Sequence, residues 1–169
     1  MDFVPLNIAI LTVSDSRTAE TDRSGDTLSA RATDAGHRVV ARRIVADTQA
    51  LLEEQLRAWV ADGEIQVILT TGGTGVTGRD VTPEAVEAVC DKLIPGFGEV
   101  FRWQSFQKIA TSTIQSRATA GVVDGTYIFA IPGSTGACKD AWDGILVHQL
   151  DIRTRPCNFA ELIPRLRES

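Results

Sequence analysis

The sequence predicts an α/β protein: a single three-layer α/β/α domain built on a mostly parallel sheet. Short apolar runs of strand length alternate along the chain with longer segments of helical periodicity. This is the pattern of βαβ units with right-handed crossovers. No repeat, charged run or low-complexity linker divides the 169 residues, so we expect one domain over residues 1–169.

Short runs rich in aliphatic and β-branched residues are the predicted strands. They are almost continuously apolar, which is typical of strands covered on both faces of a parallel sheet. Periodicity alone does not distinguish such runs from buried helices, but their shortness and β-branched content favour strands. The predicted strands are Asn7–Val13, Arg38–Val45, Gln66–Thr71 and Thr126–Ile131.

Segments of helical periodicity lie between and after these strands. Ser24 is predicted to cap the first helix, and Gly36 to end it. Trp59, Trp103 and Trp142 fall at core spacing within these segments and are interpreted as packing residues. The predicted helices run from Ser24 to about Ala35, from the Asp47–Thr48 start through Val60, from Thr82–Pro83 through Cys90, from after Gly98 through Phe106, and from Ser134 through Leu146.

The composition, with 43% hydrophobic and 23% charged residues, is that of an ordinary globular protein. The net charge of -5 argues against a general nucleic-acid binder, which usually carries a basic surface. No apolar stretch is long enough to span a bilayer, and Met1–Pro5 does not resemble a signal peptide. We therefore expect a cytoplasmic protein with neither nucleic-acid nor membrane partners.

The cysteines and histidines are too few to suggest disulfide bonds or a metal centre. Three widely spaced cysteines predict neither disulfides nor a zinc site, and we expect them to be buried free thiols. Nothing in the sequence places His37 or His148 in a site. The tail Asp151–Ser169 contains Pro156 and Pro164 and is expected to be irregular with a short helix.

Polar or glycine-rich loops follow all the predicted strands. Ligands of open α/β sheets bind beyond the carboxyl ends of the strands, so these loops are the candidate binding site. Ser14 and Asp15, which follow the first strand, are candidate substrate contacts. Asp47 follows the second strand, Gly72–Asp80 the third, and Pro132–Ser134 the fourth.

The loop after the third strand is the most informative segment of the chain. Glycine lets the backbone turn tightly and approach a ligand, and successive amides in such a turn suit a phosphate. The hydroxyls of Thr71, Thr74 and Thr77 could add further donors. The candidate phosphate-binding residues of this loop are Thr71, Gly72, Gly73, Thr74 and Gly75.

Asp80 places a negative charge beside this predicted phosphate site, and a divalent cation would resolve the conflict. Asp47 and Asp80 both follow predicted strands, so together they could hold Mg²⁺ while phosphate oxygens and water supply other ligands. They are the candidate catalytic and metal-binding residues. Two ordinary roles stay open, with Asp47 capping the following helix and Asp80 pairing with Arg79 at the surface.

Three further segments are candidate substrate or phosphate contacts. Ser24 and Gly25 could place a helix N-terminus beside an anion, the turn Pro132-Gly133-Ser134 could cradle a phosphate, and Ser116 precedes the guanidinium of Arg117. An ordinary helix cap, a plain turn and a solvent-facing arginine are the respective alternatives.

The segment Gly73–Gly78 has the G-x-G-x-x-G spacing of dinucleotide-binding proteins. That fingerprint must run straight into a helix, whereas here the helix is predicted to begin only near Pro83. A nicotinamide-dependent oxidoreductase is therefore a minor alternative. The absence of Gly-Lys-Ser/Thr after the glycines excludes a P-loop.

Taken together, these motifs resemble the MoaB/Mog family of molybdenum cofactor biosynthesis proteins over about Ile8–Phe159. The tail Thr154–Phe159 is similar to the MoaB branch in particular, and Ser134–Gly136 departs from the Mog branch. The segments that carry the resemblance are Thr71–Gly75, Arg79–Glu84, Pro95–Glu99, Ser116–Arg117 and Pro132–Ser134.

The resemblance implies a Mg²⁺-dependent adenylyltransferase, in which the phosphate of molybdopterin attacks the α-phosphorus of ATP to give adenylylated molybdopterin and pyrophosphate. It assigns Asp47 and Asp80 to the Mg²⁺-dependent step, and the glycine loop and the Ser116 region to the pterin and phosphate. The attacking phosphate is already ionised, so no general base is required. The resemblance further implies a homo-oligomer, a trimer or hexamer, and other molybdenum cofactor biosynthesis proteins as partners.

A catalytically silent molybdopterin-binding carrier is the alternative function. Some MoaB-type proteins lack the aspartate at the Asp47 position. This chain retains both Asp47 and Asp80, which favours the enzyme.

Overall fold

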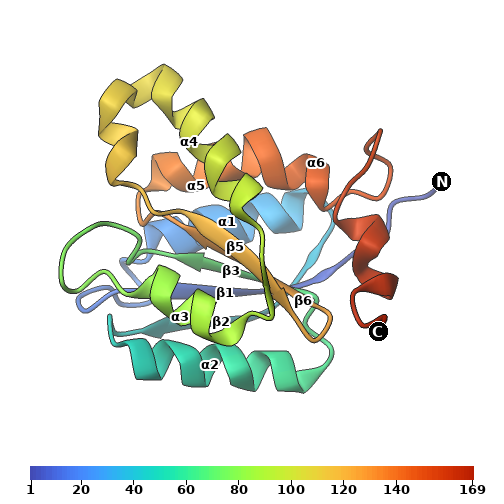
Figure 1. The fold of residues 1–169 in the computed structure, drawn as a ribbon, viewed down its shortest axis with the longest axis horizontal. Coiled ribbons are helices and arrows are strands. Elements are labelled where there is room, and N and C mark those ends of the chain that lie inside the picture. Colours follow the sequence, from blue (N-terminus) through green and yellow to red (C-terminus); the bar gives the residue numbers. More distant parts are fainter.

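The computed structural model describes residues 1–169 and forms a six-stranded sheet in the order β2-β1-β3-β6-β5-β4. Helices cover both faces of the sheet (Figure 1), which confirms the predicted three-layer α/β/α fold. The strands are β1 Asn7–Val13, β2 Arg38–Val45, β3 Val67–Thr71, β4 Lys92–Leu93, β5 Thr119–Val123 and β6 Thr126–Ile131.

The helices correspond to the predicted segments, with differences in capping, start and helix type. α4 begins at Pro95 and not after Gly98, since a proline suits the first turn of a helix. Asp22, not Ser24, caps the first helix, since its carboxylate accepts a hydrogen bond from the Gly25 amide. The predicted helix from Ser134 to Leu146 is α-helical only at its start and continues as a π-helical segment, Trp142–Leu146. The α-helices are α1 Arg23–Asp34, α2 Gln49–Asp62, α3 Thr82–Val89, α4 Pro95–Ile109, α5 Thr135–Ala141 and α6 Val147–Gln149.

The sheet is parallel from β2 to β6, and its far edge is antiparallel. β1 pairs with β2 on one side and with β3 on the other, and β3 pairs with β6. β5 and β4, which the sequence did not predict, add antiparallel pairs beyond β6. β4 has only two residues and β5 contains Ala120 and Gly121, so neither carries the aliphatic run that marks the other strands.

Two hydrophobic cores lie on opposite faces of the sheet. Successive residues of a strand point to opposite faces. In β1, Ile8 and Ile10 therefore join the core under α1, α4 and α5, while Ala9 and Leu11 join the core under α2 and α3. This double coverage is the physical reason for the continuous apolar runs in the sequence.

The outer face of α4 corrects the interpretation of Trp103 as a packing residue. Trp142 is buried and Trp59 packs partly against the core, as predicted, but Trp103 is 69% exposed. Phe97 and Phe101, one turn apart, face the sheet instead. Helical spacing alone did not distinguish the covered face of α4 from its exposed face.

The tail and the cysteines agree in part with the sequence analysis. The tail contains one short 3₁₀ helix, Ala160–Arg165, and the Tyr127 hydroxyl fixes it by donating a hydrogen bond to the Phe159 carbonyl at 3.1 Å. All three thiols are free as predicted, but only Cys138 is buried. Cys90 is half-buried, and Cys157 is exposed because it lies in the irregular tail. None of the helices combines the length and the apolar character needed to cross a bilayer.

A matched pair of leucines in α2 tests the two-core packing. Leu56 is 1% exposed and Leu51 is 45% exposed. We expect Leu56→Ala to lower the free energy of unfolding by about 2–5 kcal/mol, because it leaves a cavity under the sheet. Leu51→Ala should change it by no more than about 0.5 kcal/mol. Urea denaturation measures both values, and equal losses would contradict this assignment of the faces.

Candidate active site

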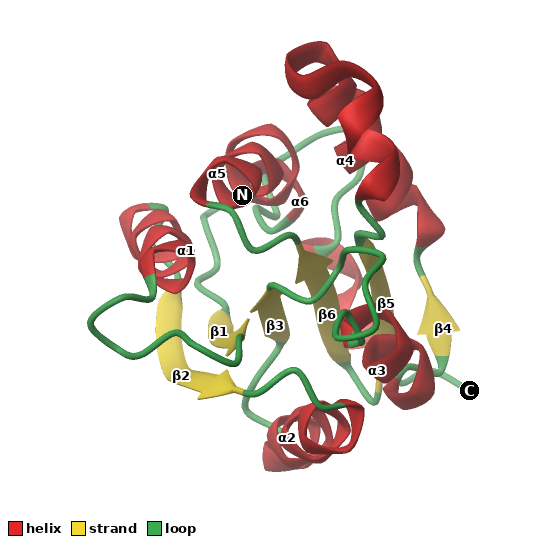
Figure 2. Ribbon diagram, turned by 90° about the vertical axis from the view of Figure 1, so that its left-hand side faces the viewer, coloured by secondary structure: helices red, strands yellow, loops and turns green.

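The loops after β1, β2, β3 and β6 emerge from one edge of the sheet, the edge that faces the viewer in Figure 2. β2 and β3 flank β1 on opposite sides, so the strand order reverses between β1 and β3. Ligands of open α/β sheets bind at such a reversal. The structure therefore brings the predicted loops together at the position where this fold binds ligands.

The glycine loop, residues 72–81, begins with two residues in the left-handed region, Gly72 at φ 104° and Gly73 at φ 69°. A Cβ at Gly72 would lie 2.3 Å from the Val13 carbonyl oxygen, and one at Gly73 would lie 2.3 Å from Thr82 Oγ1. Only glycine fits at either position. The Thr82 hydroxyl then fixes the turn by donating to the Gly72 carbonyl at 2.9 Å.

The threonine side chains in and next to this loop are buried or form hydrogen bonds within the protein. Thr71 is fully buried and its hydroxyl donates to the Pro132 carbonyl at 3.1 Å, which joins the ends of β3 and β6. Thr74 is also buried. The Thr77 hydroxyl donates to Asp80 Oδ2 at 2.7 Å. Any phosphate contact of this loop would therefore come from backbone amides, since these hydroxyls already have partners or are covered.

Arg117 holds the glycine loop from within. Its amide donates to the Thr74 carbonyl at 2.8 Å, and its guanidinium donates to the Gly75 and Asp80 carbonyls at 2.7 and 2.8 Å. The guanidinium also pairs with Glu84, and this bond holds the pKa of the Glu84 carboxyl below its usual range. Arg117, predicted as a phosphate contact, thus lies at the candidate site, but its guanidinium already bonds to groups of the protein.

Asp80 folds back onto its own loop. Its carboxylate accepts hydrogen bonds from the Thr77 amide at 2.9 Å and from the Thr77 hydroxyl. Partial burial would raise the pKa of Asp80, but these bonds, a further one from the Gly75 amide and the charge of Arg117 outweigh it and lower the pKa. Asp80 is therefore held as an ionised carboxylate.

Asp15 links three of the strand-end loops. Its carboxylate forms a bidentate ion pair with Arg79 of the glycine loop, with Nη2–Oδ1 and Nε–Oδ2 distances of 2.8 and 3.0 Å. It also accepts a hydrogen bond from the Asp47 amide at 3.0 Å. These bonds hold the pKa of Asp15 below its usual range, Arg79 contributing most. Asp15, predicted as a substrate contact, is thus bound to two neighbouring loops.

Asp47 presents its carboxylate to the glycine loop. Its Oδ1 lies 3.3 Å from the position that a Cβ on Gly73 would take. It does not cap α2, whose N-cap residue is Thr48. Burial and, next, the charge of Asp15 raise the pKa of Asp47, Arg79 lowers it, and Asp80 is near enough to raise it further. Asp47 and Asp80 therefore belong to one electrostatic cluster.

The start of α1 is organised by Asp22, a residue that the sequence analysis did not select. Its buried carboxylate accepts hydrogen bonds from Thr12 Oγ1 at 2.8 Å, the Gly25 amide at 3.0 Å and Arg42 Nη2 at 3.1 Å. The Gly25 amide, predicted to contact an anion together with Ser24, is therefore occupied. Aspartate is a preferred N-cap residue, and this was the available signal.

The turn after β6 and the start of β5 complete the edge. A Cβ at Gly133 would lie 3.2 Å from Gly72 Cα, so this turn packs directly on the glycine loop. Ser134 caps α5, since its hydroxyl accepts from the Ala137 amide at 3.1 Å. Ser116 is next in sequence to Arg117, whose amide bonds to the glycine loop, so Ser116 lies near this loop. Ser14 accepts from the amides two and three residues on, which shapes the loop after β1.

The metal role of Asp47 and Asp80 stays a prediction. No group of three or more histidine, cysteine or carboxylate side chains is arranged as a metal site. Asp47 and Asp80 would supply two oxygens, and Mg²⁺ usually takes one or two carboxylates and fills its remaining positions with phosphate and water. α3 begins at Thr82, after the glycine loop ends, so Gly73–Gly78 lacks the helix start of the dinucleotide fingerprint.

Comparison with known proteins assigns the family. The family described as "Probable molybdopterin binding domain" matches residues 9–152. This chain belongs to that family. It is 53% identical over 158 residues to molybdenum cofactor biosynthesis protein B of Escherichia coli (strain K12), an alignment that covers 94% of this chain and 93% of the relative. The protein of the same name from Bacillus subtilis (strain 168) is 42% identical over 142 residues, covering 83% and 84%.

Solved structures of the family share the whole fold. A crystal structure of molybdenum cofactor biosynthesis protein B superposes with a TM-score of 0.88 at 36% identity and covers 98% of each chain. The tungsten cofactor synthesizing protein MoaB from Pyrococcus furiosus superposes with a TM-score of 0.77 at 30% identity, covering 97% of this chain and 98% of that one. The chain thus matches molybdenum cofactor biosynthesis proteins over nearly all of the residues compared.

The charge cluster predicts opposite effects for the two halves of the Asp15–Arg79 pair. Arg79→Gln removes a positive charge and should raise the pKa of Asp47, whereas Asp15→Asn removes a negative charge and should lower it. Carboxyl ¹³C NMR titration measures both shifts, with Asp62→Asn as a distant control. Shifts in the same direction would show that the variants act through loop distortion and not through charge.

Proposed function

We propose that this chain is a Mg²⁺-dependent molybdopterin adenylyltransferase, which transfers AMP from ATP to the phosphate of molybdopterin. The observation that carries the proposal is the position of the Asp47 carboxylate against Gly73, in one charge cluster with Asp80. A phosphate-binding loop and two carboxylates are the groups that a metal-assisted transfer between phosphates requires.

The transfer needs little covalent chemistry from the protein. An oxygen of the molybdopterin phosphate attacks the α-phosphorus of ATP, the bond from that phosphorus to the bridging oxygen breaks, and pyrophosphate leaves with the electron pair. The attacking oxygen is already ionised, so no proton has to be removed. This agrees with His37, which is buried and accepts a hydrogen bond from the Leu6 amide far from the glycine loop.

The residues of this edge position and balance charge. The loop amides would orient a phosphate, Asp47 and Asp80 would hold the cation, and Arg79 offsets the carboxylates of Asp15 and Asp47. When bound, Mg²⁺ would neutralise the charge that develops on the phosphate oxygens. Positioning and charge stabilisation of this kind supply most of the rate in phosphoryl-type transfer.

One observation favours the silent molybdopterin-binding carrier as a second candidate. Asp80 Oδ2 accepts both hydrogen bonds from Thr77, and a cation on this oxygen would have to compete with them. A carrier would bind the pterin phosphate on the same loop and would not need Asp80 to be released. The two candidates differ in whether ATP is consumed.

Pyrophosphate release from ATP, Mg²⁺ and molybdopterin tests the enzyme directly. We expect turnover by the wild type and a fall in kcat/KM of at least about 100-fold in Asp47→Asn and in Asp80→Asn, because each loses a charge that holds the cation. Asp62→Asn, at the end of α2, is the matched control and should keep full activity.

Pterin binding separates the two candidates in the same experiment. The amide variants should retain molybdopterin binding, since the loop amides remain in place. Tight molybdopterin binding by the wild type without pyrophosphate release would exclude the enzyme and identify the carrier.

We further propose that the chain acts as a homo-oligomer, a trimer or hexamer. The support is a row of exposed apolar side chains along α4 and the turn that follows it. Large exposed apolar patches on one face are typical of protein interfaces. The row consists of Val100, Trp103, Phe106, Ile109 and Ile114.

Replacement of the most prominent side chain in this row tests the oligomer. Trp103→Asp should dissociate it, because a carboxylate would be buried without a partner in the interface. Leu51→Asp places the same charge on α2 and should leave the assembly intact. Sedimentation velocity measures the mass of each. A wild type that sediments as a single chain at micromolar concentration would contradict the proposal.

A further inference from the structure

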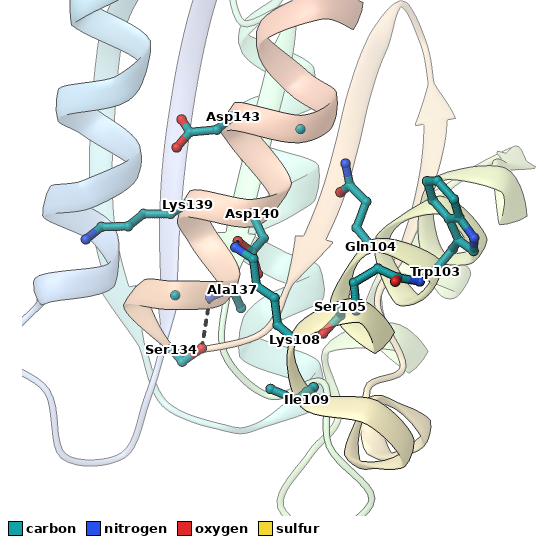
Figure 3. Close-up of a pocket in the computed structure, with 13 residues that line it drawn as sticks. Trp103, Gln104, Ser105, Lys108, Ile109, Ser134, Ala137, Lys139, Asp140 and Asp143 are labelled. Carbon is teal, nitrogen blue, oxygen red and sulfur yellow. Dashed lines mark hydrogen bonds and ion pairs between the residues drawn. The ribbon is translucent and has the colours of Figure 1, made fainter.

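A free sheet edge remains at β2, away from the pocket that adjoins the candidate active site. That pocket, of about 740 Å³ between α4 and α5, includes Ser134 in its lining (Figure 3). β2 is the terminal strand of the sheet (Figure 2), and β1 with its continuation at Ser14 supplies its only backbone partners. The outward N–H and C=O groups of β2 are therefore available to another strand.

Hollows flank this edge on both faces of the sheet. One of about 530 Å³ lies between β2 and α1, and its lining includes Arg38, Val40 and Arg42. Another, of about 370 Å³, lies between β2 and α2 and is lined mainly by apolar side chains together with Arg43. Val40 and Leu51, one from each hollow, are 49% and 45% exposed. The side chains of an added strand alternate between the two faces, so every second one would point toward the same hollow.

A bulge limits the length of β2 that can take a further strand. The register against β1 shifts at Val40, which lies between the paired residues Val39 and Ala41 and has no partner itself. From Ala41 to Val45 the register is regular. Strands of about five residues are common, so this stretch is long enough to pair with one more.

The charge of β2 selects the occupant of its edge. Three of its eight residues are arginine and none is acidic, in a chain whose net charge is -5. Arg42 already pairs with two carboxylates at the start of α1. The Arg43 guanidinium binds only the Gln55 amide oxygen, at 2.8 Å, and Arg38 has no ion pair. Two positive charges at this edge therefore lack a carboxylate.

The same charges oppose a second copy of this strand. Antiparallel pairing of two β2 edges about Arg43 would place the two Arg43 side chains opposite each other, and like charges directly opposite destabilise a sheet. An acidic strand meets the reverse condition, because its carboxylates would face arginines that have no carboxylate partner. Charge thus protects the edge from self-association and leaves it open to an acidic strand.

We propose that the β2 edge binds an extended acidic segment of a partner protein, which adds a seventh strand beside Ala41–Val45. Main-chain hydrogen bonds supply the affinity in this mode of recognition, and pockets for alternate side chains supply the specificity. Acidic side chains pair with the arginines that lack a carboxylate, and the apolar side chains between them enter a flanking hollow. β2 ends two residues before Asp47, so the partner lies beside the candidate active site. The inference does not depend on the proposed function.

Fluorescence anisotropy on the full-length protein tests the edge with a labelled heptapeptide of alternating valine and glutamate. The double variant Arg38→Glu/Arg43→Glu should weaken binding at least about 10-fold, because each exchanged charge repels the peptide. The double variant Lys92→Glu/Arg165→Glu makes the same change in net charge on β4, at the opposite edge of the sheet, and in the tail. It is the matched control and should bind like the wild type.

Three further measurements separate backbone pairing from charge. The same peptide carrying N-methyl groups on alternate amides should lose at least about 10-fold in affinity in one of its two methylation patterns, because the donors of the ladder are removed. A heptapeptide of alternating valine and lysine should not bind. Hydrogen–deuterium exchange on the wild type needs no variant: the glutamate peptide should slow exchange of amides within residues 41–45 and leave residues 92–93 unchanged.

The outcomes that contradict the proposal are distinct. Equal affinity for the glutamate and lysine peptides would overturn it, as would undiminished binding by Arg38→Glu/Arg43→Glu or no binding of the glutamate peptide at millimolar concentration. Protection from exchange outside β2 and not within it would place the peptide elsewhere. A smaller assembly of Arg38→Glu/Arg43→Glu in sedimentation velocity would assign the edge to a second copy of this chain and reject the acidic partner.

Discussion

Close backbone contacts at three glycines hold the candidate active site together. Gly72 packs against the Val13 carbonyl, Gly73 lies between Thr82 and Asp47, and Gly133 packs on Gly72. Through these contacts the loops after β1, β2, β3 and β6 meet at one point. A side chain at any of these positions would separate them and move Asp47 away from the glycine loop. The geometry of the charged groups therefore depends on residues that carry no chemistry of their own.

Two arginines stabilise this loop cluster in different ways. Arg117 lies beneath the glycine loop and donates to its carbonyls, so it fixes the shape of the backbone. Arg79 lies at the outer side and pairs with Asp15, which in turn binds the Asp47 amide. The first sets where the loop amides point, and the second limits the mutual repulsion of the carboxylates. Each role requires the planar, multi-donor guanidinium, which lysine lacks.

α4 connects the site to the rest of the molecule through two different faces. Phe97 and Phe101 anchor it in the core above the sheet. Gln104 and Trp103 both line the pocket beside α5, and Trp103 is also exposed. Core packing thus fixes the helix that forms one wall of this pocket and also presents the proposed subunit contact.

The sequence by itself determined the fold class, the parallel strands and the position of the glycine loop. Apolar runs such as Asn7–Val13 identify strands because a strand covered on both faces must be apolar at every position. The glycine loop was recognisable because a cluster of glycines directly after an apolar strand predicts a tight turn at the strand end. Both signals are local, so one sequence was sufficient to read them.

Only the tertiary structure decided how the individual side chains are used. Arg117 turned inward because Glu84 and two loop carbonyls surround it, and Asp22 replaced Ser24 as the cap because Thr12 and Arg42 stabilise its carboxylate. The exposure of Trp103 and the orphaned acceptor of Gln104 likewise depend on what lies across from α4. These outcomes come from contacts between residues far apart in the chain, and no local pattern encodes which distant group will be the partner.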